Sequence, residues 1–157
     1  THLTAAADGR VHDLSPDERL ATVIDAVRTV QPNIDAVVLS GDVADDGSVG
    51  AYERAAGLVA VMGTPVMAAA GNHDDPRLLA TVFGPPDPIS LGGWRIVALD
   101  SSRPERIDGE LDLAVAEAAL DAVAGHPTVL VVHHPARPID VFDITRARKP
   151  SDIWSSA

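Results

Sequence analysis

Four short apolar runs without regular polar alternation restrict the fold of this 157-residue chain more than any other feature of its sequence. They cover residues 35–40, 65–70, 94–99 and 128–132. Strands that lack polar alternation are buried on both faces, as in parallel sheets that helices cover. Because stretches with helical spacing of apolar residues lie between these runs, the sequence predicts an α/β layered fold with a largely parallel sheet.

Helix signals occupy the segments between the runs. Ser15 and Glu18 form a capping box around Pro16, and apolar residues then recur at helical spacing as far as Val30. The predicted helices cover residues 16–30, 49–62, 76–83 and 111–124. Residues 84–93 are rich in proline and glycine and are predicted to be a loop.

Two of the predicted helices have an apolar face. In the helix over 49–62, the residues on this face are Tyr52, Ala55, Leu58, Val59 and Met62. In the helix over 111–124, the residues predicted to point inward are Leu111, Val115, Ala119, Ala122 and Val123. Residues 136–157 show no clear periodicity.

The composition excludes several classes of function. A formal net charge of −11 argues against passive binding to nucleic acid or to anionic lipid. The 46% of apolar residues suffice for the core of one domain, and the absence of cysteine excludes disulfides and thiolate zinc sites. No apolar run approaches 18 residues and no signal peptide is visible, so we expect a cytoplasmic protein without a membrane partner.

Polar residues that can bind metal ions follow each predicted strand. Asp42 follows the first strand, Asn72 and His73 the second, Asp100 the third and His133 the fourth. Open α/β sheets bind ligands at the carboxyl ends of their strands, so these side chains are expected at one edge of the sheet. Mixed His, Asp and Asn sites suit zinc, manganese or iron. His2 belongs to the same set if a strand precedes it.

Each of these residues also has an ordinary structural explanation. Asp42 and Asn72 fit turn residues, and His133 alone fits a histidine at a strand end. Asp74 and Asp75 are predicted to cap the helix that starts at Pro76. Asp100 is predicted to cap a turn or to support a ligand, and His12 and His126 are predicted to be surface residues. The joint occurrence of the polar clusters after successive strands favours a metal site.

The ordered motifs resemble those of a known family. They read Thr-His-Leu, Gly-Asp-Val-Ala-Asp-Asp-Gly, Gly-Asn-His-Asp-Asp and Val-Val-His-His-Pro along the chain. This series resembles the calcineurin-like metallophosphoesterases and, within them, the bacterial class III cyclic nucleotide phosphodiesterases, which include enzymes of the 3′,5′-cyclic AMP phosphodiesterase type. The subgroup resemblance depends on Asp45, Gly47, Tyr52 and Asp75. The resemblance implies that residues 1–157 form part of a single calcineurin-like phosphoesterase domain.

The resemblance implies a role for each motif residue. His2 resembles a ligand of the first metal ion, and Asp42 matches the carboxylate that bridges both ions. Asn72 and His133 match ligands of the second ion. His73, and with it Asn72, is expected to contact the phosphate, and His73 can assist the leaving oxygen. The implied cofactors are two divalent ions of the manganese, iron or zinc class, and the implied nucleophile is a hydroxide between them, with His73 and Asp42 as the catalytic residues.

Some family features do not occur in this sequence. The aspartate of the family's Asp-x-His motif would precede Thr1, and its late Gly-His-x-His motif is absent. Ala136 follows Pro135, where relatives usually have a second proline. We therefore expect an internal fragment, truncated at both ends of the layered fold. Such a fragment should bind at most one metal ion well, at the second site, and hydrolyse little.

Three functions remain open on this basis. The first is a two-metal phosphodiesterase acting on 3′,5′-cyclic nucleotides, and the second is a broad phosphomonoesterase on the same scaffold. The third is an inactive chain that binds a phosphate or a partner protein. The expected partner is a small phosphoester substrate, with no nucleic acid and no membrane, and a homodimer is one option for its assembly.

Overall fold

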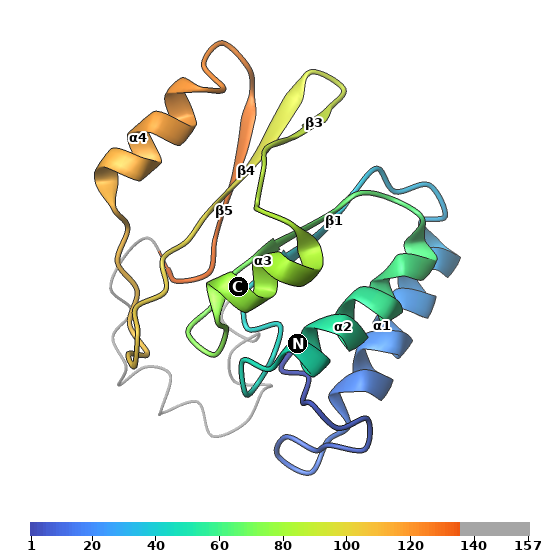
Figure 1. Ribbon diagram of the computed structural model, residues 1–157. Coiled ribbons are helices and arrows are strands. Elements are labelled where there is room, and N and C mark those ends of the chain that lie inside the picture. The colour runs from blue at the N-terminus through green and yellow to red at the C-terminus, as the bar shows by residue number, and fades with distance from the viewer. Residues whose placement is uncertain (136–157) are drawn as a thin grey trace, which may run out of the picture.

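Helices and strands alternate along most of the chain in the computed structural model, which describes residues 1–135 (Figure 1). The helices are α1 (Pro16–Val30), α2 (Val49–Val59), the short 3₁₀ helix η1 (Ala60–Met62), α3 (Pro76–Phe83) and α4 (Leu113–Asp121). The strands are β1 (Val37–Ser40), β2 (Val66–Ala69), β3 (Ile89–Leu91), β4 (Trp94–Leu99) and β5 (Thr128–Val132). The four predicted strands and four predicted helices are therefore present, and the α/β fold class is confirmed.

The strands pair mainly in parallel. β1 pairs with β2 in parallel, in a register that places Ser40 opposite Ala69. β4 pairs with β5 in parallel and with β3 antiparallel, which gives the order β3-β4-β5. Met67 and Ala69 of β2 pack against Ala98 of β4 and Val131 of β5, so the two sheets share a core. The parallel pairs direct the ends of β1, β2, β4 and β5 toward one side of the molecule (Figure 1).

The prediction of a loop over residues 84–93 is wrong in part, because β3 lies within it. Gly92 and Gly93 form the two-residue turn between β3 and β4, and both have positive φ angles, 53° and 88°. A two-residue turn of this kind matches the right-handed twist of a hairpin and requires residues that tolerate positive φ. The Gly-Gly pair was the sequence signal for this hairpin, but the three-residue strand is too short to show periodicity.

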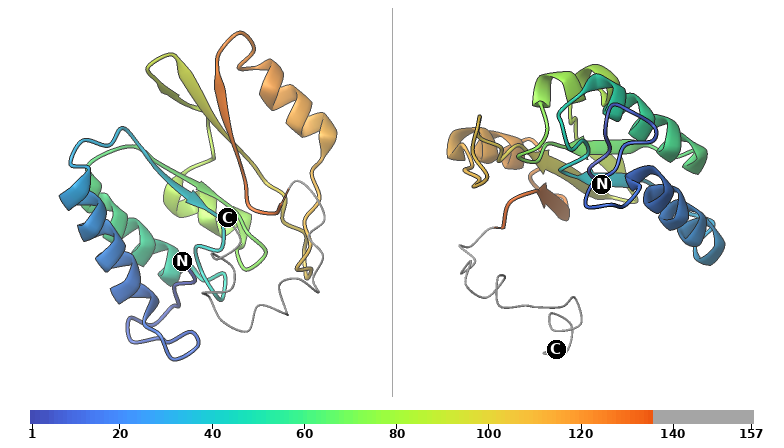
Figure 2. Two further views of the ribbon diagram at one scale, coloured as in Figure 1. Left: turned by 180° about the vertical axis from the view of Figure 1, so that it is seen from behind. Right: turned by 90° about the horizontal axis from the view of Figure 1, so that it is seen from below.

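The helices pack in two groups, although Val23 and Val30 on the apolar face of α1 stay 58% and 82% exposed. α1 and α2 lie side by side at one end, whereas α4 packs against β4 at the other end (Figures 1 and 2). The larger core joins α1, α2 and α3 to the strands β1 and β2, and its centre includes Ile24, Leu39, Tyr52, Ala55 and Leu79. The predicted face of α2 is confirmed, since Tyr52, Ala55 and Val59 are buried and Leu58 and Met62 pack against them.

The predicted inward face of α4 is wrong in part. Val115 is 60% exposed and Ala122 is exposed, whereas Ala116 and Val123 are buried against β4. One residue along a helix rotates the side chain by about 100°, so a face that runs through Ala116, Ala119 and Val123 leaves Val115 outside. The strand β5 also departs from the expectation of burial on both faces, because Val129 and Leu130 are each 45% exposed.

No helix within the described residues is long and apolar enough to cross a membrane. Residues 136–157, for which the sequence indicates no periodicity, lie outside the part of the chain that the structure describes.

Candidate metal centre

The polar residues that follow β1, β2 and β5 lie together with His2. Leu3 forms a parallel bridge with Ala44, and the backbone N–H groups of His2 and Leu3 donate to the carbonyls of Asp42 and Val43 at 2.8 and 2.9 Å. The N-terminal residues therefore lie along the segment that extends β1. This pairing places the His2 side chain next to the Asp42 carboxylate.

The Asp42 carboxylate lies between two imidazole rings. Its Oδ2 is 3.4 Å from Nε2 of His2, and its Oδ1 is 3.4 Å from Nε2 of His133. Neither contact has the geometry of a hydrogen bond. Donor atoms that bind the same ion at about 2.0–2.2 Å are spaced about 3.0–3.6 Å apart, so both distances fit pairs of ligands that share an ion. The donor set thus fits one ion on each side of Asp42.

His133 has a defined tautomer in this arrangement. Its Nδ1 lies 3.0 Å from the carbonyl oxygen of Ser40, which can only accept a hydrogen bond, so Nδ1 carries the proton. The lone pair of Nε2 is therefore directed to Asp42. Metal-binding histidines commonly donate their other ring N–H to a carbonyl or carboxylate, which fixes the ring orientation. The neighbouring His134 is bonded through Nδ1 to the buried Ser101 at 2.8 Å, which ties the ends of β4 and β5 together.

His2 has a carboxylate near each ring nitrogen. While Nε2 lies near Asp42, Nδ1 lies 3.2 Å from Oδ1 of Asp45, although the angle is unsuited to a hydrogen bond. The buried Nδ1 makes no hydrogen bond within the described residues. This arrangement fits a metal ligand whose second nitrogen faces an orienting carboxylate.

His73 also contacts Asp45. Its Nδ1 lies 2.9 Å from the carbonyl oxygen of Asp45 and 3.7 Å from the carboxylate of the same residue. The rings of His2 and His73 meet edge to face, with their centres 4.8 Å apart. Suitable donor atoms of His2, Asp45 and His73 all lie within 4.8 Å of one another, so this group could also hold one cation. Because the Asp45 carbonyl accepts a hydrogen bond from Nδ1 of His73, we interpret Asp45 as a residue that orients the His73 ring. Nε2 of His73 can then contact a ligand.

Asp45 is a candidate site residue that the sequence reasoning missed. In the sequence it served only as a sign of the subgroup. The available signal was its position on the same loop as Asp42, three residues further along. A loop without periodicity gives no direction for its side chains, so only the folded structure shows that Asp45 faces His2 and His73.

Two glycines allow this close approach. A Cβ atom on Gly41 would overlap the His133 ring, and a Cβ on Gly71 would overlap the carboxylate and backbone nitrogen of Asp42. Gly41 has a φ of 104° and Asp42 a φ of 48°, a left-handed conformation that side chains rarely adopt. The N–H of His73 donates to Oδ1 of Asp42 at 3.1 Å, which fixes the carboxylate further.

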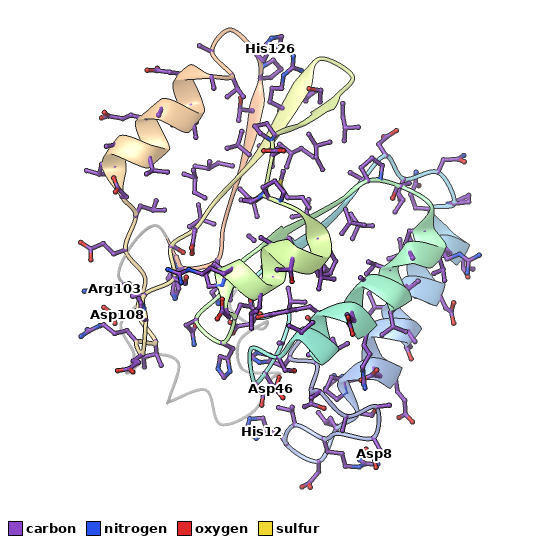
Figure 3. All side chains as sticks on the ribbon, viewed as in Figure 1. Asp8, His12, Asp46, Arg103, Asp108 and His126 are labelled. Carbon is purple, nitrogen blue, oxygen red and sulfur yellow. The ribbon has the colours of Figure 1, made fainter. Side chains whose placement is uncertain are left out.

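Asn72 belongs to a cavity whose described lining includes none of His2, Asp42, His73 and His133, so its predicted place with these residues stays a prediction. Its side chain lines a cavity of about 500 Å³ between the start of α3 and the loop after β4. The other lining residues that carry charge are Asp74, Asp75, Arg77, Asp100, Arg103 and Glu105. The Asn72 amide makes no hydrogen bond within residues 1–135, which leaves it available to a ligand. Figure 3 shows Arg103 and Asp108 on the loop at this side of the molecule.

The remaining predictions about polar residues have mixed outcomes. Asp75 caps α3, because its carboxylate accepts from the N–H groups of Arg77 and Leu78, as predicted. The prediction that Asp74 caps the same helix is wrong, since its carboxylate accepts from backbone N–H groups of the turn after β1 and from Gly71 in its own turn. Asp100 accepts from the backbone and side chain of Ser102, which confirms it as a turn cap.

The two histidines predicted to be surface residues are exposed. His12 lies in the loop before α1, and His126 bonds to Arg95 at 3.2 Å. Figure 3 shows His126 at the opposite end of the molecule from Asp46, the neighbour of Asp45. Neither belongs to the group around Asp42.

A mixed α/β domain that gathers imidazole and carboxylate groups beside its strand ends can hold divalent metal ions there. Comparison with known families gives the particular assignment: a model described as calcineurin-like phosphoesterase matches residues 11–156. The chain therefore belongs to the calcineurin-like metallophosphoesterases. The name of the family denotes metal ions and phosphoester chemistry.

Three of the similar proteins come from bacteria. The chain is 38% identical to a probable cyclic nucleotide phosphodiesterase of Synechococcus sp., over 85% of this chain and 54% of that protein. It is 31% identical to the 3′,5′-cyclic adenosine monophosphate phosphodiesterase CpdA of Pseudomonas aeruginosa, over 98% of this chain and 60% of that protein. It is 32% identical to a cAMP/cGMP dual specificity phosphodiesterase of Mycobacterium tuberculosis, over 88% and 48%. The chain thus spans about half the length of these relatives.

Proposed function

We propose that this chain forms part of a phosphodiesterase that hydrolyses 3′,5′-cyclic nucleotides with two divalent ions of the manganese, iron or zinc class. The observation that carries the proposal is the Asp42 carboxylate, whose two oxygens face Nε2 of His2 and Nε2 of His133, both at 3.4 Å. The names of the similar bacterial proteins support the substrate class. In this proposal residues 1–157 are part of a single phosphoesterase domain.

The proposed ligands divide into two sets that share Asp42. His2 and Asp42 would hold the first ion, and Asp42, Asn72 and His133 the second. Two such ions, when bound, would polarise the phosphoester and activate water for in-line attack. The chain's own residues then bind and orient the substrate and supply the proton.

The charge of the site explains why cations are needed. The carboxylates of Asp42 and Asp45 lie beside His2 in a chain with a formal net charge of −11, and both would repel a phosphate. Divalent ions would reverse the local field and make the same position attractive to an anion. The acidic composition and a phosphoester substrate are therefore compatible only when the metal sites are filled.

His73 is the proposed proton donor to the leaving oxygen. Its Nδ1 proton faces the Asp45 carbonyl at 2.9 Å, so its Nε2 remains available to the substrate. Protonation of the leaving oxygen requires a donor that recovers its proton near neutral pH, which an imidazole can do. Asn72 is proposed to donate its amide N–H to a phosphate oxygen, as well as its oxygen to the second ion.

The cavity beside Asn72 is proposed to receive the organic part of the substrate. Its volume of about 500 Å³ lies in the range of small-molecule sites. Arg77 and Arg103 are the cationic side chains that line it. Its lining has no aromatic residue among the described residues, so recognition of a nucleoside there would depend on hydrogen bonds and charge.

The test compares the hydrolysis of phosphodiesters with the hydrolysis of a phosphomonoester. In the complete protein, metal-dependent hydrolysis of bis-p-nitrophenyl phosphate, p-nitrophenyl phosphate, 3′,5′-cyclic AMP and 3′,5′-cyclic GMP is measured before and after chelation. The proposal predicts that the diesters, including a cyclic nucleotide, are hydrolysed faster than the monoester and that chelation abolishes turnover. Faster hydrolysis of the monoester would establish the phosphomonoesterase instead. Metal binding without hydrolysis of any substrate would establish a binding protein.

A further inference from the structure

We propose that Asp74 is a positioning residue of the metal centre, whose carboxylate clamps the turn after β1 to the turn after β2. This inference rests on the proposed metal site, and it assigns a task to a residue that is neither a proposed ligand nor a helix cap. The clamp would keep Asp42 and Asn72, which come from the two different turns, at the spacing that one ion requires.

Three backbone N–H groups converge on this carboxylate. Oδ2 accepts from Val43 at 3.1 Å and from Gly71 at 2.9 Å, and Oδ1 accepts from Ala44 at 2.9 Å. Val43 and Ala44 belong to the turn after β1, whereas Gly71 belongs to the turn after β2. Hydrogen bonds that involve an ionised acceptor are shorter and stronger than neutral ones, so this carboxylate is a firm link between the two turns.

The donors are direct neighbours of the proposed ligands. Val43 follows Asp42 in the chain, and Gly71 precedes Asn72. Asp74 therefore fixes the peptide on the carboxyl side of one ligand and on the amino side of the other. A movement of either turn relative to the other would stretch at least one of the three bonds.

The clamp also explains how Asp42 keeps an unfavourable backbone. Asp42 has a φ of 48°, and residues in this region persist only where their surroundings over-determine them. The two N–H groups that follow Asp42 are both bound by Asp74. Loss of that acceptor would allow the peptide to relax toward an ordinary conformation, which would turn the Asp42 carboxylate away from His2 and His133.

The Asp74 side chain does not cap α3, the helix that begins next to it. The cap of α3 is Asp75, which accepts from the N–H groups of Arg77 and Leu78 at 2.9 and 3.1 Å. Asp74 makes no hydrogen bond to the first turn of α3 within the described residues. Adjacent aspartates thus have separate tasks, and this separation provides a matched control.

Tyr52 contacts the turn that carries Asp74. It is fully buried in α2, and its hydroxyl accepts from the N–H of Asp75 at 2.8 Å. Burial and then the negative charge of Asp74 raise the pKa of Tyr52, and a side-chain hydrogen bond to Asp74 adds to the effect. The phenol therefore keeps its proton, and a protonated phenol can donate to the Asp74 carboxylate.

The experiment compares Asp74→Asn with Asp75→Asn by calorimetric titration of the metal-free protein with Mn²⁺ and Zn²⁺. Both variants lose one negative charge at adjacent positions, and asparagine caps a helix about as well as aspartate. In Asp74→Asn the new side chain has only one acceptor oxygen, and its amide nitrogen would face a backbone N–H group. We expect Asp74→Asn to weaken metal binding by about 10–100-fold, the usual effect of losing a group that orients ligands. Asp75→Asn should stay within about twofold of the unchanged protein, because its capping bonds persist.

The clamp is overturned if Asp74→Asn binds metal as the unchanged protein does, or if both variants weaken binding equally, which would indicate charge alone. Failure of the unchanged protein to bind metal would refute the proposed function instead. If circular dichroism shows that Asp74→Asn is unfolded, Tyr52→Phe decides the question, because it removes the hydroxyl and keeps the ring. If Tyr52→Phe lowers metal affinity by at least about threefold, the clamp is supported, and if its affinity is unchanged, the clamp is refuted.

Discussion

Gly71→Ala should damage the metal centre through a steric effect alone. Gly71 lies between β2 and Asn72, and it is not among the residues with positive φ. An alanine Cβ there would lie 2.9 Å from Nε2 of His133 and closer still to the backbone nitrogen and Oδ1 of Asp42. The substitution would therefore force apart two of the proposed ligands without introducing backbone strain.

The size of the displacement follows from these contacts. Ordinary contacts of a Cβ atom begin at 3.4 Å, so even the least crowded neighbour, at 2.9 Å, has to move by about 0.5 Å. Metal–ligand distances tolerate only about 0.2 Å. We expect metal affinity to fall by at least about tenfold, or about 1.4 kcal/mol. Overpacking of this kind also costs about 1–3 kcal/mol of folding stability.

The assay pairs metal titration with urea unfolding, and Gly57→Ala is the control. Gly57 lies inside α2, and no atom lies within 4 Å of the position of its added Cβ. Alanine should stabilise the helix there by about 0.5–1 kcal/mol and leave metal affinity unchanged. The steric reasoning is refuted if Gly71→Ala binds metal within about twofold of the unchanged protein, or if Gly57→Ala weakens binding as much.

Three further predictions concern the site and its scaffold. In the complete protein, Asp42→Ala should lower metal-dependent hydrolysis more than His12→Ala does, because the Asp42 carboxylate is proposed to bind both ions; equal losses in a turnover assay would contradict the bridging role. His73→Ala should lower turnover by about 10²–10⁴-fold with metal content unchanged, and metal loss in elemental analysis would contradict its role as proton donor. Arg54→Ala should destabilise the protein by about 1 kcal/mol, because Arg54 and Asp17 form an ion pair between α2 and α1 at 2.5 Å; an unchanged urea midpoint would refute this.

Local signals in the sequence account for most of the secondary structure. Ser15 and Pro16 begin α1, and Asp75 and Pro76 begin α3, because capping depends on residues within a single turn. The face of α2 was predictable for a similar reason, since helical periodicity depends only on spacing along the chain. β3 and the face of α4 were not predicted correctly, because a three-residue strand and a helix rich in alanine carry little periodic information.

The placement of polar residues at strand ends also followed from the sequence, because a parallel sheet directs the ends of its strands to one side. Which of these residues face one another was decided by the tertiary structure. The link from Asp74 to Val43 joins residues 31 positions apart, and the bond from His133 to Ser40 joins residues 93 apart.

The sequence by itself determined the α/β class, the helix starts and the set of residues at the strand ends, because these depend on short-range spacing and on the geometry of a strand. Only the tertiary structure decided that Asp45 faces His2 and His73, and that Asp74 joins two turns when its position before Pro76 suggested a helix cap. The physical reason is that a loop side chain has no periodic direction. Its partner is set by the packing of the strands and helices that carry the loop.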